Sequence, residues 1–327
     1  MADSASHFQN PDRNLALELV RATEAAAIRA VPFIGRGDKN GADGAAVNAM
    51  RTFLATVDFA GVIVIGEGEK DKAPMLFNGE QVGTGDGPAT DIAVDPIDGT
   101  SLTAAGRQNA ISMIAAADRG SMLDAHTVFY MDKIVAGPEG VGVIDIRKPV
   151  GENIRALAKA KGKGVDEMLV GVLDRPRHEQ LIADIRAAGA GTRLLLDGDV
   201  AGGINAASYE GRLDMCVGTG GSPEGVATAC AIKALGGVIQ TILAPKTDDE
   251  RQKGLDAGLR FDHVYEAGEL VTSDNTFFVA TGVTDGMLVR GVQRKGPIIR
   301  TESIVLRSHS GTIRRITADH LVSKWLD

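Results

Sequence analysis

Segments of strand length alternate with helical segments through the middle of the chain, and this alternation constrains the fold more than any other feature. The strand-like segments cover residues 167–174, 192–200 and 213–220. Apolar residues recur at helical spacing in residues 151–162, 177–189, 200–209 and 223–237. Because helices that alternate with strands usually cover the faces of a sheet, the pattern predicts an α/β fold.

The first part of the chain shows the same kinds of segment and is predicted to form its own lobe. Helical spacing runs from Pro11 to Val31, and residues 45–56 indicate a second helix. Strands are expected at residues 60–66, 91–95, 110–118 and 127–137, and late strands at 275–286, 303–311 and 312–320. Since the pattern changes near Pro149 and 327 residues suit two lobes, we expect one lobe at 1–148 and another at 149–327.

Composition narrows the classes of function. The formal charge of −8 argues against the basic surface that holds nucleic acid. No apolar run reaches the ~18 residues that span a bilayer, and the N-terminus has no signal-like core, so we expect a cytoplasmic protein with no membrane partner. Cys216 and Cys230 lie in apolar segments without metal-site spacing and are expected to pack in the core.

The segment DPIDGT, residues 95–100, carries the strongest chemical signal. Pro96 lacks an N–H and is expected to end the strand, which would let Asp95 and Asp98 converge. Gly99 and Thr100 would then open the next segment with unpaired N–H groups and a hydroxyl. Because paired carboxylates repel each other, they favour hard divalent cations such as Mg²⁺ or Mn²⁺. An ordinary turn with Asp98 as a helix cap explains this motif alone equally well.

Three further acids follow small residues. Asp38 lies in a glycine-framed loop, Glu67 follows a strand, and Glu224 falls in the first turn of a helix. In GGSPEG, residues 220–225, the serine is expected to cap that helix, the proline to occupy its first position and the glycine N–H groups to cradle a phosphate. Taken singly, Asp38 is typical of a turn and Glu224 of a carboxylate at a helix dipole. Together with the DPIDGT pair, the acids favour a metal site.

The motifs GRGDK, IGEGEKD, DIAVDPIDGT, LDRPRH, DGDVAGGI and GGSPEG, in this order, resemble those of class II fructose-1,6-bisphosphatases. These belong to the lithium-sensitive, metal-dependent sugar and inositol phosphatase superfamily. The resemblance covers nearly the whole chain and implies a layered sandwich of two α/β lobes with mixed sheets. It implies hydrolysis of the 1-phosphate of fructose 1,6-bisphosphate in gluconeogenesis, with Mg²⁺ or Mn²⁺, in a homo-oligomer that is a dimer or a tetramer.

The resemblance also implies roles for individual residues. The implied metal ligands are Asp38, Glu67, Asp95, Asp98 and Glu224, and the implied catalytic residues are Thr100 and Asp38. The implied substrate-binding residues are Asp98, Gly99, Thr100, Tyr130, Arg175, Pro176, Arg177, Asp197, Gly198, Asp199 and Gly221. Some relatives carry Glu at the position of Asp98, and the shorter side chain is expected to alter metal spacing or preference.

The residues themselves leave alternatives open at the substrate positions. The two arginines of LDRPRH suit a second phosphate, although such a run is also typical of a solvated loop. The acids of DGD could bind sugar hydroxyls or form an Asx turn, and Tyr130 could be an ordinary strand aromatic. His178 is expected to order the arginine loop.

Other functions fit the sequence less well. Histidines form no HxH or HExxH pair, GTGDGP at 83–88 follows no convincing strand and opens no helix, and no GK[ST] phosphate loop is present. Zinc hydrolases, dinucleotide enzymes and P-loop kinases are therefore disfavoured. The remaining alternatives are use of sedoheptulose 1,7-bisphosphate, an inositol-type monophosphatase, and a sugar-phosphate sensor without catalysis.

Overall fold

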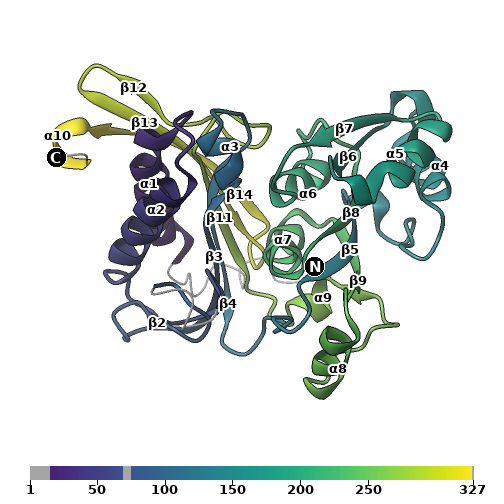
Figure 1. Ribbon diagram of the computed structural model, residues 1–327, viewed down its shortest axis with the longest axis horizontal. Helices are drawn as coiled ribbons and strands as arrows, with labels where there is room; N and C mark the ends of the chain where they lie inside the picture. The colour runs from purple at the N-terminus through teal and green to yellow at the C-terminus, as the bar shows by residue number, and fades with distance from the viewer. Residues whose placement is uncertain (1–14, 69–74, 326–327) are drawn as a thin grey trace, which may run out of the picture.

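The computed structural model describes residues 15–68 and 75–325, which form five layers in the order helix, sheet, helix, sheet, helix (Figure 1). Both sheets contain parallel and antiparallel neighbours. The predicted α/β sandwich with mixed sheets is therefore confirmed. Among the described residues, no helix has the length and apolar character needed to span a membrane.

The first sheet has eight strands in the order β12-β13-β11-β4-β3-β1-β2, with β14 paired to β13. Only β1 and β3 are parallel to each other. The strands are β1 (Ala60–Ile65), β2 (Gln81–Val82), β3 (Ala89–Asp98), β4 (Ile111–Asp118), β11 (Phe277–Gly282), β12 (Gln293–Lys295), β13 (Ile298–Arg307) and β14 (Thr312–Leu321).

The second sheet has six strands in the order β10-β9-β5-β8-β6-β7, with β6 parallel to both of its neighbours. The strands are β5 (Tyr130–Ala136), β6 (Leu169–Leu173), β7 (Gly191–Leu195), β8 (Met215–Gly221), β9 (Val238–Leu243) and β10 (Tyr265–Glu266). The division of strands between the two sheets therefore differs from the division at residue 149 between the expected lobes. Strand β5 precedes residue 149 but lies in the second sheet, and β11 to β14 follow it but lie in the first. A boundary at residue 149 stays a prediction.

Helices cover the outer faces and fill the space between the sheets. The outer helices of the first sheet are α1 (Leu15–Ala30) and α2 (Lys39–Leu54), and those of the second are α4 (Val150–Lys161) and α5 (Glu179–Ala187) (Figure 1). Between the sheets lie α6 (Val200–Ala207) and α7 (Ser222–Leu235). The short helices are α3 (Thr100–Ala104), α8 (Asp248–Asp256), α9 (Ala267–Leu270) and α10 (Val322–Trp325).

The composition of α7 explains how it fits between two sheets. Its sequence SPEGVATACAIKAL is buried on nearly all sides, and most of its buried side chains are small. Small side chains let both sheets approach the helix closely, whereas an amphipathic helix would leave its polar stripe without water. Cys216 and Cys230 are buried as predicted, and both pack in the core between the two sheets.

Several boundaries differ from the sequence predictions. Helix α2 begins at Lys39, before the expected residue 45, because Asp38 caps it by accepting a hydrogen bond from the Gly41 N–H (2.8 Å).

The predicted cap at Ser222 is wrong: β8 runs through Gly221, which is itself the N-cap, and the Ser222 hydroxyl is buried without a partner among the described residues. Gly220 and Gly221 are therefore strand residues. Strand β9 and helix α8 were not anticipated, and the helix start expected at Pro11 lies outside the described residues.

Replacement of Phe278 by Ala tests the core. Phe278 is fully buried on β11, so Phe278→Ala should lower the free energy of unfolding by about 3–5 kcal/mol through lost burial and a residual cavity. Leu255→Ala is the control, because Leu255 is 50% exposed and should change stability by no more than about 0.5 kcal/mol. Urea unfolding measures both values, and equal losses would contradict the assigned core.

Candidate active site

A β-bulge in β3 positions the two acids of DPIDGT. Asp95 pairs with Met113 and Asp98 pairs with Ile111, so two residues on β3 lie opposite one on β4. A bulge tolerates Pro96, which has no N–H to donate to the ladder. The Ile97 N–H donates to Asp95 Oδ1 (3.0 Å). The prediction that the strand ends at Pro96 is therefore wrong in detail, because the strand bulges there and continues to Asp98.

Acids from both halves of the sandwich line one cavity of about 350 Å³. Its carboxylates come from α2, the end of β1, β3, the segment after β7, and the first turn of α7. They belong to Asp43, Glu67, Asp95, Asp98, Asp197 and Glu224. Gly99 and Thr100, at the start of α3, also line the cavity. The cavity therefore brings together residues that are up to about 180 positions apart in the chain, as two facing sheets allow.

The carboxylates oppose one another's ionisation. Burial raises the pKa of Glu67 to about 7, and the charge of Asp43 adds to this rise. Burial first, and then the charge of Asp98, holds the pKa of Asp95 well above its ordinary value, while burial and Glu224 do the same for Asp98. Burial also raises the pKa of Glu224. Such a cluster is more stable when protons or cations balance its charge.

Two unpartnered oxygens indicate what the cluster lacks. Asp98 Oδ2 and Glu224 Oε2 are buried and have no hydrogen-bond partner among the described residues. Carboxylate oxygens of this kind fit hard divalent cations. In residues 15–68 and 75–325, however, no three His, Cys, Asp or Glu side chains already form a group that could hold a metal ion. The donor chemistry fits a cation, and the carboxylates must draw closer together to coordinate one.

Two glycines allow the second sheet to approach these acids. A Cβ atom at Gly198 would lie 2.5 Å from Asp98 Oδ1, and Gly198 has a φ of +64°, which favours glycine. A Cβ atom at Gly221 would overlap the Glu224 carboxylate. Gly198 is therefore favoured by its positive φ and by its contact with the Asp98 carboxylate, while a side chain at Gly221 would displace the Glu224 carboxylate.

A cationic group lies beside the acidic cavity, because its central ring, Tyr130, packs edge-on against Phe129 (4.8 Å between centroids), which lines the cavity. Tyr130 pairs with Gly221 across β5 and β8, and Lys246 Nζ lies 3.8 Å from the centroid of the Tyr130 ring. The Arg177 guanidinium carbon lies 5.3 Å from the same centroid, and Arg177 donates to the Thr219 carbonyl (2.8 and 3.1 Å). One aromatic ring thus contacts two cations.

Arg175 points elsewhere. Its Nη2 donates to Asp197 Oδ1 (2.8 Å), and its Nη1 donates to the Leu196 carbonyl (2.6 Å). Pro176 separates the two arginines and begins the short 3₁₀ turn Pro176–His178, in which Arg177 lies. The structure therefore places Arg177 in the cationic group and Arg175 against an acid of the cavity.

His178 orders this turn, as expected. The buried ring accepts a hydrogen bond from the Thr219 N–H at Nε2 (2.8 Å), so Nδ1 must carry the proton that it donates to the Leu173 carbonyl (2.8 Å). Burial lowers the pKa of His178, which favours this neutral form. The ring thereby joins the end of β6 to β8, next to Arg177.

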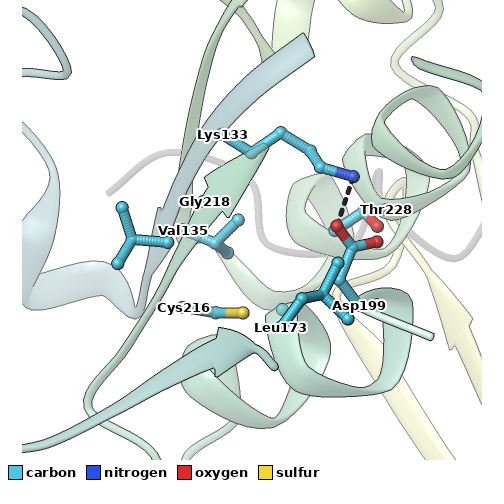
Figure 2. A pocket seen from close by; sticks show the side chains of 9 residues that line it. Lys133, Val135, Leu173, Asp199, Cys216, Gly218 and Thr228 are labelled. Atoms are coloured by element: carbon cyan, nitrogen blue, oxygen red, sulfur yellow. Dashed lines mark ion pairs between the residues drawn. The ribbon is translucent and has the colours of Figure 1, made fainter. Parts of the chain in front are cut away.

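A buried ion pair supports the second-sheet side of the site. Lys133 extends from β5 to Asp199, with Nζ 2.6 Å from Asp199 Oδ2 (Figure 2). It also donates to the Gly221 carbonyl (3.1 Å). Its charge lowers the pKa of Asp98 and of Glu224, against the larger effect of burial. Cys216 lies in the same small pocket, and burial raises the pKa of its thiol to about 12, so it is no nucleophile.

The cavity contains four of the five predicted metal ligands and leaves out the fifth, Asp38, while the site as a whole includes three charged residues that the sequence did not single out. Asp38 is exposed and caps α2, whereas Asp43, one turn further along that helix, lines the cavity. Lys133 and Lys246 were also missed. A lysine within the apolar segment MDKIVAG was a usable signal for Lys133, since a charge in a buried strand needs a partner. Nothing local marked Asp43 or Lys246, because their positions depend on the fold.

Metal-free protein should lose stability as the pH rises through the acidic range. The folded protein binds a proton at Glu67 up to a pH of about 7, while the unfolded chain releases it near the ordinary value of 4.5. The free energy of unfolding should therefore fall between these pH values, by up to about 3 kcal/mol from this group. Urea unfolding with a chelator measures this slope, and Glu67→Gln should flatten it. Equal slopes in both proteins would contradict the assigned burial of Glu67.

Comparisons with known proteins agree with this geometry. A family model described as "Bacterial fructose-1,6-bisphosphatase, glpX-encoded" matches residues 13–320. The chain is 44% identical over 325 residues to "Fructose-1,6-bisphosphatase 1 class 2" of Escherichia coli (strain K12), covering 95% of this chain and 96% of the relative. The values are the same for "Fructose-1,6-bisphosphatase class 2" of Shigella flexneri. The chain therefore belongs to the glpX-encoded family of bacterial fructose-1,6-bisphosphatases.

Proposed function

We propose that this protein hydrolyses the 1-phosphate of fructose 1,6-bisphosphate, giving fructose 6-phosphate and phosphate for gluconeogenesis. Membership of the bisphosphatase family supports the reaction. The observation that carries the proposal is a carboxylate cavity, with buried unpartnered oxygens, joined through Phe129 to a cationic group around Tyr130. The carboxylate cavity suits a metal-dependent reaction at one phosphate, and the cationic group suits a second phosphate on the same substrate.

Mg²⁺ or Mn²⁺ is the proposed cofactor, held by Glu67, Asp95, Asp98 and Glu224. Asp38 stays in the proposed set through the family resemblance, and Asp43 joins it because it lines the cavity. Bound divalent cations would neutralise the charge of the phosphate ester and lower the pKa of a water molecule. The oxygen-only donor set supports these ions over softer metals. Asp98 has a shorter side chain than the Glu that some relatives carry, which supports an altered spacing of the metal ions at that position.

The chain's own residues position the reacting groups. Thr100, at the first position of α3, lines the cavity next to Asp98 and Gly99, where its hydroxyl could orient the attacking water. Asp197 is held by Arg175 and Asp199 by Lys133, so their carboxylates are fixed in place to accept hydrogen bonds from sugar hydroxyls. These contacts would align the substrate without a covalent phosphoenzyme.

The cationic group favours a bisphosphate over a monophosphate. Arg177 and Lys246 share the ring of Tyr130, and neither forms an ion pair with a carboxylate among the described residues. Two cations so placed suit the second phosphate of a sugar bisphosphate. Sedoheptulose 1,7-bisphosphate carries the same two phosphates and remains the second candidate substrate. An inositol monophosphate would leave the cationic group unused. We also propose that the protein works as a homo-oligomer.

Substitution of Thr100 and Asp95 tests the reaction. Thr100→Ala and Asp95→Asn should each lower phosphate release from fructose 1,6-bisphosphate by about 10²–10⁴-fold, because one removes a positioned hydroxyl and the other a metal-binding charge. Thr100→Ser keeps the hydroxyl and is the matched control. Release should require Mg²⁺ or Mn²⁺ and stop with a chelator. Absence of release from folded protein with either metal would contradict the proposal and favour the sensor.

Lys246→Met tests the second phosphate site. The variant should raise KM for fructose 1,6-bisphosphate by roughly tenfold and change kcat little. A tenfold change corresponds to about 1.4 kcal/mol of binding free energy. Fructose 1-phosphate has no second phosphate, so its KM should not change. Lys253→Met is the control, because this lysine on α8 is exposed and pairs with Asp249. An equal rise of KM for both substrates would contradict the assignment.

A further inference from the structure

Strand β14 forms a long open edge of the eight-stranded sheet. It has ten residues and pairs along its whole length with β13, and no other described strand pairs with its outer edge. The unpaired N–H and C=O groups of such an edge pair readily with another chain. Edge strands are therefore usually short, or are interrupted by prolines or bulges. The sequence TIRRITADHL contains no proline, and its register with β13 is unbroken.

The direction of each backbone group follows from one hydrogen bond. The Val322 N–H donates to the Pro297 carbonyl (2.9 Å), which continues the register that pairs Leu321 with Ile298. In an antiparallel ladder, alternate residues direct their N–H and C=O groups toward the partner strand. The even-numbered residues of β14 therefore bond to β13, while the odd-numbered residues direct their backbone groups outward.

The outward-directed residues are also the exposed ones. Every odd-numbered residue of β14 is exposed, and every even-numbered residue is half-buried. Two of the exposed side chains are large and apolar, since Ile313 is 47% and Leu321 is 52% exposed. An unpaired edge with apolar side chains at both of its ends is an uncommon surface for an isolated chain.

The pattern of β14 is complementary to itself. If two copies of the strand run antiparallel with Thr317 opposite Thr317, then Ile313 faces Leu321 and Arg315 faces Asp319. Apolar residues thus meet apolar residues, and opposite charges meet, which are the favourable cross-strand pairs. All of these residues have outward-directed backbone groups, so every pair can also exchange main-chain hydrogen bonds.

Other twofold registers lose these pairs. A shift of two residues in either direction leaves both Arg315 and Asp319 opposite uncharged residues. A shift of four places Arg315 opposite Arg315, or Asp319 opposite Asp319, and like charges directly opposite each other are destabilising. The side chains therefore specify a single register, which an edge without a function would have no reason to do.

Within residues 15–68 and 75–325, the neighbouring structure leaves the edge accessible. Helix α10 follows β14 directly, but it turns onto the helical layer, where Trp325 stacks on Phe53 with 5.3 Å between ring centroids. Asp319 already accepts hydrogen bonds from Nε and Nη2 of Arg300, and Arg315 donates to the Leu288 carbonyl and pairs with Glu210 at 3.9 Å. A carboxylate accepts about four hydrogen bonds and a guanidinium donates five, so both groups retain capacity for a second copy.

We propose that a second copy of this chain pairs antiparallel with β14, with Thr317 on the twofold axis, so that the eight-stranded sheets of two copies become continuous. The interaction surface is the outer edge of β14, and the partner is the same strand. The backbone ladder supplies the attraction, and the pairs Ile313–Leu321 and Arg315–Asp319 supply the register.

A disulfide experiment tests the register. Two Thr317 residues would face each other at a Cα separation of about 5.5 Å, which a disulfide can bridge. Thr317→Cys should therefore form a covalent dimer under mild oxidation. Ile313→Cys is the matched control on the same exposed face, since its copies would lie about 26 Å apart along the strands. The two native cysteines are buried. Covalent dimers at neither position, or equally at both, would overturn the proposal.

A backbone substitution tests the hydrogen bonds. Thr317→Pro removes only an outward-directed N–H, which an edge strand tolerates, whereas Thr317→Val keeps it. Sedimentation velocity should show an even multiple of the chain mass for the native protein and Thr317→Val, and half of it for Thr317→Pro. Far-ultraviolet circular dichroism checks folding, and the cysteine variants decide the matter if the proline variant does not fold. A native protein of single-chain mass, or an assembly that Thr317→Pro leaves intact while folded, would overturn the proposal.

Discussion

The mutual repulsion of buried carboxylates is the constraint on which the site depends. The fold places several acids around one cavity, where burial raises the pKa of Glu67, Asp95 and Asp98. A protein that only needed stability would put apolar residues there, because uncompensated buried charge is costly. The surrounding structure offsets this cost in part with Lys133, and otherwise through the two extensive cores that flank the cavity. Bound cations would provide the remaining compensation, and metal binding would then be linked to the stability of the fold.

The site is divided between the two sheets, and each side supplies a different kind of group. The first sheet and its helices contribute Asp43, Glu67 and the bulged strand β3, which carry the charge that a metal would balance. The second sheet contributes the cations near Tyr130 and the acids that Lys133 and Arg175 hold in place. Helix α7 contacts both sheets and adds Glu224 to the cavity from its first turn. Small side chains on α7 and the glycines at 198 and 221 let the two sides meet.

The sequence predicted those features that depend on neighbouring residues. The α/β class follows from local periodicity, and DPIDGT indicates converging acids because a proline, two carboxylates and a glycine act within six positions. Sequence could not predict which strands share a sheet, because β11 pairs with β4 across more than 150 residues. Asp43 and Lys246 were missed for the same reason. The error at Ser222 arose because β8 extends to Gly221, so that pairing with β5 outweighed the local capping preference.

The order of strands in the first sheet has a consequence for synthesis. Strand β4 pairs with β3 on one side and with β11 on the other, but β11 begins at residue 277, after the whole second sheet has been made. During translation, the edge of β4 that pairs with β11 therefore stays unpaired while about 160 further residues are added, at a rate of roughly 5–20 residues per second. An exposed strand invites pairing with a neighbouring nascent chain. Until β11 is synthesised, this edge of β4 is therefore available for such pairing in the ribosome-bound chain.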